Sequence, residues 1–429
     1  MPSDFCEELL PFVAVAKDQD ETDLLAGYRE IFSIPMDTVY LDGNSLGLLG
    51  SPSRRMIDEV VDSWGKIAVN GWTEGEQPWF TMAEKLGDAM ATLVGCPSGT
   101  VIATGSTTAN LHQLLATLYN PASSLKAILT DATGFPSDIY AMRSFAKLVG
   151  LTDSQIILLE PDASGFLSEE RIIEAIRSQA VQLVVLPSVV YTTGQLLDME
   201  HLTREAHKLG ACIGFDCAHS VGIIPHQLDD WGVDFAFWCG YKYLNGGPGA
   251  TAGLYLNKRH FGKQPGLAGW FGADKTRQFE MSPHLIPADG AGALQIGTPN
   301  ILSMAPLLGS VNTISEAGVD VLRAKSLHMT AMMMEMIDSI SSGCELEIVT
   351  PTEDRRRGGH VAVHHPKARD ICQILKQNKV IADHRPPDLI RFSPAPLYNS
   401  YMDCVIAMNA LHGVLQTEIH PTNTVSLIP

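Results

Sequence analysis

Lys242 stands where a lysine amine could act as a nucleophile. It follows the mostly apolar run 233–238 at the end of a predicted strand, and a glycine-rich turn, 246–249, comes soon after it. Burial disfavours the ammonium form, so it lowers the pKa of a lysine and makes the amine more nucleophilic. A surface lysine after an edge strand explains this segment equally well when it is taken alone. Covalent catalysis through Lys242 is therefore a hypothesis that needs further residues.

Asp216 and His219 precede Lys242 at the end of another predicted strand, 212–215, at a spacing that fits one crossover between neighbouring strands. Asp216 could pair with a protonated pyridine nitrogen and so keep a cofactor ring as an electron sink, while His219 could stack on that ring or bond its substituents. Separately, they could be a helix N-cap and a satisfied core residue. Together with a strand-end lysine they favour pyridoxal phosphate, which Lys242 would carry as a Schiff base.

A hydroxyl-rich helix start could hold the phosphate of this cofactor. The segment 101–110 runs from a strand through a glycine and three hydroxyl residues into a predicted helix. The N–H groups at a helix N-terminus bind anions, so Thr107 and Thr108 are the expected phosphate ligands. Capping of the helix is compatible with that role because both use the same helix end.

A second loop, 133–140, joins another predicted strand to a helix. Phe135 could cover the cofactor ring, and Asp138 could bond near its phenolate or the substrate. Pro136 and Ser137 also mark an ordinary helix start, so this loop carries less information than the others.

The elements that position these residues alternate between short β-branched runs and longer amphipathic ones, which indicates βα units on a mostly parallel sheet. The predicted strands are 100–103, 127–129, 155–158, 181–186, 212–215, 235–238 and 251–256. The predicted helices include 109–118, 168–178 and 199–208, the last followed by Gly210. Seven strands indicate one large α/β domain.

A long helical stretch, 306–340, leads into a smaller α+β region. Its predicted strands are 345–350, 359–364 and 389–392, around a helix at 367–377. We therefore expect three parts. They are an N-terminal segment, 1–65, that packs with the small domain and the active site; a large cofactor-binding domain, 66–312; and a small C-terminal domain, 313–429.

Composition narrows the class of protein. A net charge of −18 without a basic run makes a nucleic-acid partner unexpected. The eight cysteines form no CxxC pair, which favours a reducing compartment over disulfides or zinc. The sequence shows no export signal and no apolar run of about 20 residues, so we expect no membrane partner and a cytoplasmic location. His360, His364 and His365 are expected on a solvated strand face, and no metal site is expected.

Several segments together resemble kynureninases, which have the aspartate-aminotransferase-like fold (fold type I) and use pyridoxal phosphate to cleave kynurenine hydrolytically. The resemblance spans most of the chain. The segments that carry it are 41–47, 135–138, 214–219, 230–245, 269–272 and 390–399.

The resemblance implies roles for the matched residues. Lys242 would carry the cofactor and remove the α-proton, Asp216 would pair with the ring nitrogen, and His219 would contact the cofactor. Water would add to the γ-ketone, and cleavage between the β and γ carbons would release an anthranilate-type acid and alanine. Tyr241 would reach the phosphate and act as the acid.

The resemblance also implies contacts across a homodimer, because Trp270 and Thr298 of the partner subunit would complete the phosphate site. The substrate, a small-molecule amino acid, would contact Asn44 and Ser45. Arg391 would hold its α-carboxylate, where a planar guanidinium suits bidentate bonding.

Three positions bear on the aryl group of the substrate. Family members that prefer 3-hydroxykynurenine tend to have His, Ser and Asn where this chain has Trp72, Gly297 and Thr298. The trio therefore predicts a preference for kynurenine, with Trp72 alternatively a core or interface aromatic.

Alternatives stay open. The sequence differs from the usual family sequence in the segments 187–195, 105–108 and 294–296. One alternative is therefore a kynureninase-like enzyme that acts on a modified kynurenine. Another fold type I enzyme, of the cysteine desulfurase or β-lyase type, would share the lysine and the aspartate. A desulfurase would need a reactive cysteine in a mobile loop. Cys212, Cys217 and Cys239 are expected to be buried, and Cys344 and Cys372 lack the positive charge nearby that would lower their pKa. A silent scaffold protein is the alternative outside enzymes.

Overall fold

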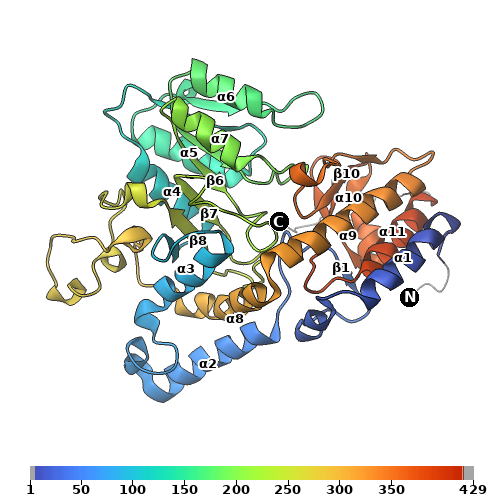
Figure 1. The fold of residues 1–429 in the computed structure, drawn as a ribbon, viewed down its shortest axis with the longest axis horizontal. Helices are drawn as coiled ribbons and strands as arrows, with labels where there is room; N and C mark the ends of the chain where they lie inside the picture. The colour runs from blue at the N-terminus through green and yellow to red at the C-terminus, as the bar shows by residue number, and fades with distance from the viewer. Residues whose placement is uncertain (1–4, 418, 420–429) are drawn as a thin grey trace.

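The computed structural model describes residues 5–417 and residue 419 and has two lobes. In Figure 1 the larger lobe surrounds strands β6–β8, and the smaller lobe holds β10, α10 and α11. The N-terminal helix α1 (Leu10–Glu21) lies in the smaller lobe and packs against α11 (Tyr401–Leu415).

A seven-stranded sheet forms the centre of the larger lobe. Its order is β2-β8-β7-β6-β5-β3-β4, in which β8 runs antiparallel to both its neighbours and all the other pairs are parallel. The strands are β2 (Val101–Ala103), β3 (Ala127–Asp131), β4 (Ile156–Leu159), β5 (Val181–Pro187), β6 (Cys212–Asp216), β7 (Phe235–Trp238) and β8 (Gly253–Leu256). The predicted mostly parallel sheet of seven strands is confirmed.

Helices cover this sheet, as the βα pattern predicts. Helices α4–α7 pack against β4–β7, and α3 packs against β2 and β8. The helices of this lobe are α2 (Ser51–Ile67), α3 (Met82–Leu93), α4 (Thr107–Leu118), α5 (Pro136–Leu148), α6 (Glu169–Ser178), α7 (Met199–Lys208) and α8 (Ile301–Ala317). Side-chain caps begin three of them: the oxygens of Ser106, Ser168 and Asp198 accept backbone N–H groups of the first turn.

The smaller lobe has an antiparallel sheet of order β12-β13-β10-β9. Its strands are β9 (Glu347–Ile348), β10 (Val361–His364), β12 (Asp383–Arg385) and β13 (Leu389–Phe392), with α9 (Val319–Ile340) and α10 (Ala368–Gln377) as further helices. A two-stranded parallel sheet joins β1 (Val39–Tyr40) to β11 (Val380–Ile381), which fixes the N-terminal segment to this lobe.

The single helical stretch predicted at 306–340 is two helices. Gly318 separates α8 from α9 with φ +80°, a conformation that side-chain-bearing residues rarely adopt. Hydrophobic periodicity continues through both helices, so the pattern alone could not show the break.

Two hydrophobic cores follow the lobes. The first is built around the large sheet, and the second contains Leu9, Val39 and Leu41 together with residues from Met329 onward. The expected boundaries at 65 and 312 stay predictions.

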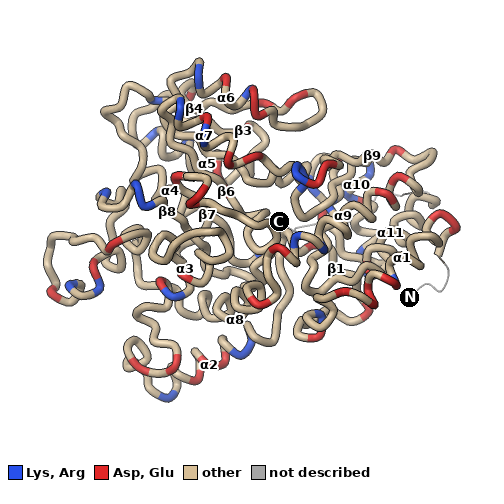
Figure 2. Tube along the Cα trace, viewed as in Figure 1, with Lys and Arg blue, Asp and Glu red and all other residues tan. Residues whose placement is uncertain are grey.

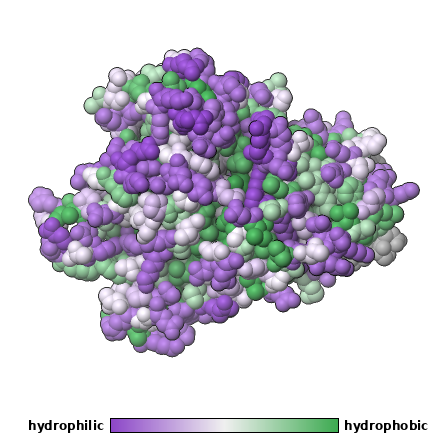
Figure 3. Space-filling model, viewed as in Figure 1, coloured by the Kyte–Doolittle hydropathy of each residue, from purple (hydrophilic) through white to green (hydrophobic). Residues whose placement is uncertain are grey.

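Acidic and basic positions are interspersed over the outer helices and loops (Figure 2), whereas β7 and β8 carry none. In the view of Figure 3 hydrophobic residues are most frequent at the junction of the lobes and on the smaller lobe. Among the described residues no helix is long and apolar enough to cross a membrane.

Candidate active site

A cavity of about 250 Å³ lies at the carboxyl ends of the large sheet. The loops after β2, β3, β5, β6 and β7 line it, because parallel strands bring their carboxyl ends to one edge. Nine of the residues singled out from the sequence are on its wall: Thr107, Thr108, Phe135, Ser137, Asp138, Asp216, His219, Tyr241 and Lys242.

Lys242 lies at the centre of this group. Its Nζ is 2.9 Å from Nε2 of His219 and 6.0 Å from the ring centre of Phe135. Burial, followed by the charge of Lys242, holds the pKa of His219 well below its usual value, so the imidazole is neutral and Nε2 can accept from the ammonium group. The other ring nitrogen of His219, Nδ1, has no partner among the described residues.

Three buried carboxyl groups face the same cavity. Asp216 ends β6, and its Oδ1 accepts the backbone N–H of Ala218 at 2.8 Å. Burial, followed by the nearby Asp216, raises the pKa of Asp138 well above its usual value, so Asp138 holds a proton that it can share with Asp216. Burial also raises the pKa of Asp216, and the Lys242 ammonium partly offsets this. A second positive charge next to Asp216 would therefore stabilise its carboxylate form.

Asp131 is a cavity residue that the sequence reasoning missed. It ends β3 as Asp216 ends β6, and this shared position at a strand end was the signal that could have found it. Burial raises its pKa to about 6, Oδ1 accepts the hydroxyl of Thr133 at 3.0 Å, and Oδ2 has no partner among the described residues. Tyr191, after β5, is a second cavity residue found only in the structure.

The start of helix α4 forms the anion-binding end of the cavity. Ser106 caps the helix, and the hydroxyl groups of Thr108 and Ser137 are hydrogen-bonded to each other. Thr107, Thr108 and Ser137 all reach the cavity wall, whereas Pro136 begins α5 and does not. Free N–H groups and hydroxyls at a helix N-terminus suit a phosphate dianion.

These residues fit pyridoxal phosphate. A phosphate site, a reactive amine and a buried carboxylate that favours a cation surround one cavity. The unpartnered Nδ1 of His219 and Oδ2 of Asp131 are polar atoms of the kind that a bound ligand or water satisfies.

Tyr241 is on the cavity wall, and burial raises its pKa, so the phenol stays protonated. Its backbone carbonyl accepts the N–H of Gly47 at 2.8 Å. This bond places the segment 41–47 at the edge of the site, although its residues come from the opposite end of the chain.

Arg391 is fully buried in β13 and is not on the cavity wall. Its guanidinium donates through Nε to Asp383 at 2.8 Å, through NH1 to the carbonyl of Tyr191 at 2.8 Å, and through NH2 to Oγ of Ser45 at 3.3 Å. The structure thus brings Arg391 and Ser45 together. Asn44 is buried next to them, and its side-chain amide has no partner among the described residues.

The residues expected to act on the aryl group or across an interface lie away from this chain's own cavity. Trp72 ends a short 3₁₀ helix and packs against the rings of Trp79 and Phe271, at 5.7 and 6.1 Å between ring centres. Trp270 is 47% exposed, and Gly297 and Thr298 are exposed as well. Their roles stay predictions.

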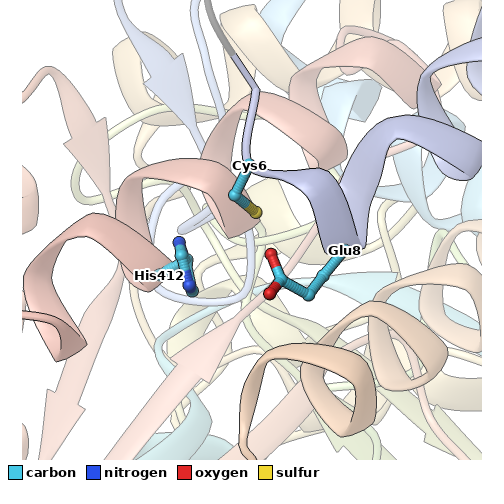
Figure 4. A group of neighbouring side chains, drawn as sticks. All are labelled: Cys6, Glu8 and His412. Carbon is cyan, nitrogen blue, oxygen red and sulfur yellow. The ribbon is translucent and has the colours of Figure 1, made fainter.

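Two groups of described side chains could offer metal ligands, and neither lies at the cavity. They are Cys6, Glu8 and His412 (Figure 4) and Cys212, Asp234 and His260. In the first, burial followed by the neighbouring Glu8 raises the pKa of the thiol, which keeps it protonated, and Glu8 is exposed. In the second, Asp234 already accepts from two histidines and a backbone N–H.

Comparison with known proteins places this geometry in a family. Residues 322–411 match the family model described as the kynureninase C-terminal domain. The chain is 47% identical over 409 residues to a kynureninase of Geobacillus thermodenitrificans, with 95% of each chain covered. It is 46% identical over 413 residues to a kynureninase of Bacillus mycoides, with 96% of each covered.

Solved structures show the same fold at low identity. A cysteine desulfurase from Thermococcus onnurineus superimposes with a TM-score of 0.78 at 19% identity, covering 91% of this chain and 98% of that protein. A C-DES mutant with glycine covalently linked to its PLP cofactor superimposes at 0.74 and 17% identity, covering 89% and 98%. The fold is therefore fold type I, and the extent and level of identity to the curated relatives show that this chain belongs to the kynureninase family.

Proposed function

We propose that this protein cleaves L-kynurenine to anthranilate and L-alanine with pyridoxal phosphate bound in the cavity. The observation that carries the proposal is the meeting of Lys242, Asp216 and the start of α4 around one cavity, in a chain of this family. When bound, the cofactor supplies an electron sink that makes the α-proton of an amino acid acidic.

The chain's own residues then divide the work. Asp216 would pair with the ring nitrogen of the cofactor, and Thr107, Thr108 and the N–H groups of α4 would hold its phosphate. Lys242 would hold the cofactor, and its amine would accept the α-proton of the substrate. Tyr241 keeps its proton at neutral pH because burial raises its pKa. After water has added to the γ-ketone and the β–γ bond has broken, Tyr241 can protonate the remaining fragment, which becomes alanine.

The proposed preference for kynurenine over 3-hydroxykynurenine rests on Trp72, Gly297 and Thr298. We expect a higher kcat/KM for kynurenine, measured from anthranilate fluorescence against the hydroxylated analogue, with Lys242→Ala as the inactive control. Equal values, or a higher value for the analogue, would contradict the preference and leave the reaction standing. Visible cofactor absorbance without cleavage of either compound would contradict the reaction.

We further propose a cytoplasmic homodimer with shared active sites. The dimer is supported by Trp270 and Thr298, which are exposed and do not line this chain's own cavity. The cytoplasmic location is supported by the eight cysteines, all of which are free. Sedimentation of the cofactor-loaded protein should give twice the mass of the chain, whereas an active monomer would contradict the dimer.

A cysteine desulfurase activity is the rival within this fold. Cys239 is the cysteine on the cavity wall, and burial raises its pKa, which keeps it a thiol. A desulfurase needs a thiolate at the reacting sulfur, so release of sulfide from L-cysteine should be absent.

A further inference from the structure

His360, expected on a solvated face, is fully buried next to the candidate site. Its ring centre lies 5.9 Å from that of His219, and neither of its ring nitrogens has a hydrogen-bond partner among the described residues. Gly194 packs closely against this ring, since a Cβ at that position would lie 3.3 Å from Nε2 of His360. Buried polar groups are nearly always satisfied, so a histidine with two open nitrogens beside a reaction centre suggests a ligand contact.

The pairing of β10 with β13 places His360 beside Arg391. Ala362 is opposite Arg391 in this antiparallel pair, and residues two apart on a strand project from the same face. Continuing the register by two residues puts His360 on the same face as Arg391, as its diagonal neighbour. Both side chains come from the smaller lobe and face the cavity residues of the larger one.

The charges around His360 favour an anion. Burial lowers the pKa of His360 well below its usual value, and the positive charges of Arg391, Lys242 and Arg385 lower it further, while the nearby backbone of Tyr191 offsets only a small part of this. The two arginines share the carboxylate of Asp383. Asp42, also nearby, has its pKa raised to about 7 by burial and by Asp383, so it supplies only part of a negative charge near neutral pH.

Tyr191 stands between this group and the cavity. It lines the cavity, and its carbonyl oxygen accepts from NH1 of Arg391. A carboxylate that enters from the cavity can take this N–H from Tyr191. It can accept about four hydrogen bonds, more than one guanidinium edge supplies, and a neutral imidazole offers one N–H donor.

We propose that His360 is a substrate-binding residue that completes, with Arg391 and Ser45, a pocket for the α-carboxylate of the amino-acid substrate. The proposal rests on the proposed function, because it needs a substrate whose amine reaches Lys242 while its carboxylate reaches Arg391. The imidazole stays neutral and donates its N–H to the carboxylate.

The test compares two ligands on the cofactor-loaded protein. L-Alanine, the expected product, carries a carboxylate, and ethylamine is a smaller amine without one. Binding of each is followed by the change in visible absorbance. The variants are His360→Leu, which removes the donor, and His360→Gln, whose amide N–H can replace it. His364→Leu is the matched control, since His364 ends β10, four residues after His360, is half-buried and pairs with Asp388 instead.

We expect His360→Leu to weaken alanine binding about 10- to 100-fold, the loss for a hydrogen bond to a charged group, and to change ethylamine binding by less than about twofold. His360→Gln should keep most of the affinity, and His364→Leu should match the unaltered protein. With kynurenine, the leucine variant should raise KM more than it lowers kcat.

Equal losses for alanine and ethylamine in both His360 variants would show a structural role and overturn the proposal, as would unchanged alanine binding in His360→Leu. The glutamine variant keeps the test decisive if the leucine variant does not fold. Carboxylate-dependent binding in a protein that releases no anthranilate from kynurenine would contradict the proposed function and leave the role of His360 standing.

Discussion

The carboxyl groups around Lys242 show that burial, more than residue type, sets the protonation of this site. Asp131, Asp138 and Asp216 all have raised pKa values because the cavity wall removes them from water. The raised pKa of Asp138 favours its protonated form, so this side chain can donate a hydrogen bond, a role that an exposed aspartate does not take at neutral pH.

Asp131→Asn should stabilise the cofactor-free protein at pH 7.5 by about 1–3 kcal/mol, measured by urea unfolding. The folded-state pKa of Asp131, about 6, lies above the value near 3.9 of an exposed aspartate. Between these pH values the folded protein binds the extra proton, so stability falls as pH rises through this window. Asparagine does not ionise, so the variant does not lose stability in this window, and the free energies of unfolding of the two proteins should converge below about pH 4.

Asp58→Asn is the control, since Asp58 is an exposed residue of α2, and it should change stability by less than about 0.5 kcal/mol. A lower stability of Asp131→Asn at pH 7.5 would show that the bond to Thr133 outweighs the cost of burying the charge.

At the scale of elements, the parallel arrangement of the sheet assembles the site. Five strands, β2, β3, β5, β6 and β7, run in the same direction. The loops that follow them therefore meet at one edge of the sheet, although they are far apart in the chain. Between α8 and α9 the chain passes to the smaller lobe at Gly318, whose positive φ ends α8.

Gly318→Ala should lower the free energy of unfolding by about 1–2 kcal/mol, because an alanine pays for a left-handed conformation that glycine adopts freely. Space is not the cause, since a Cβ there would meet Val321 only at 3.7 Å. Gly413→Ala, inside α11 and open to solvent, is the matched control and should stabilise by up to about 1 kcal/mol. Thermal unfolding of both variants measures the contrast, and equal effects would refute the strain argument.

At the scale of the whole molecule, one chain supplies most of the proposed cofactor site, and Trp270 and Thr298 stand apart from it. The proposed dimer accounts for this separation, since a twofold interface would bring each pair to the other subunit's cavity.

Mixing two inactive variants tests the shared site. Lys242→Ala and Trp270→Ala, unfolded together and refolded as an equal mixture, should regain about a quarter of the activity, because half of the dimers are hybrids with one intact site each. Each variant refolded alone is the control. If Trp270 instead serves its own chain, the hybrids have no intact site and the mixture stays inactive.

Much of the site follows from local sequence. Lys242, Asp216, His219 and the two threonines each follow a short apolar run, and the end of a buried parallel strand is a place that periodicity can predict. The order of these residues along the chain was enough to favour one cofactor. Phe235–Trp238 and Met199–Lys208 have the predicted boundaries because turn residues mark both ends of each.

Other features depend on which distant segments pack together. His360 lies in a segment whose alternating pattern predicted a strand with a solvated face. In the structure it stands just before β10, and the loop around Gly194 and the larger lobe bury it. Similarly, the bonds of Arg391 join Ser45, Tyr191 and Asp383, three segments that no periodicity connects. The sequence by itself determined the strands of the large sheet, the lysine and its aspartate, because these follow from local hydrophobic pattern and chemistry. It did not predict β1, β11 or β12, which are only two or three residues long. Only the tertiary structure decided burial and charge pairing at the junction of the lobes, because both depend on long-range packing.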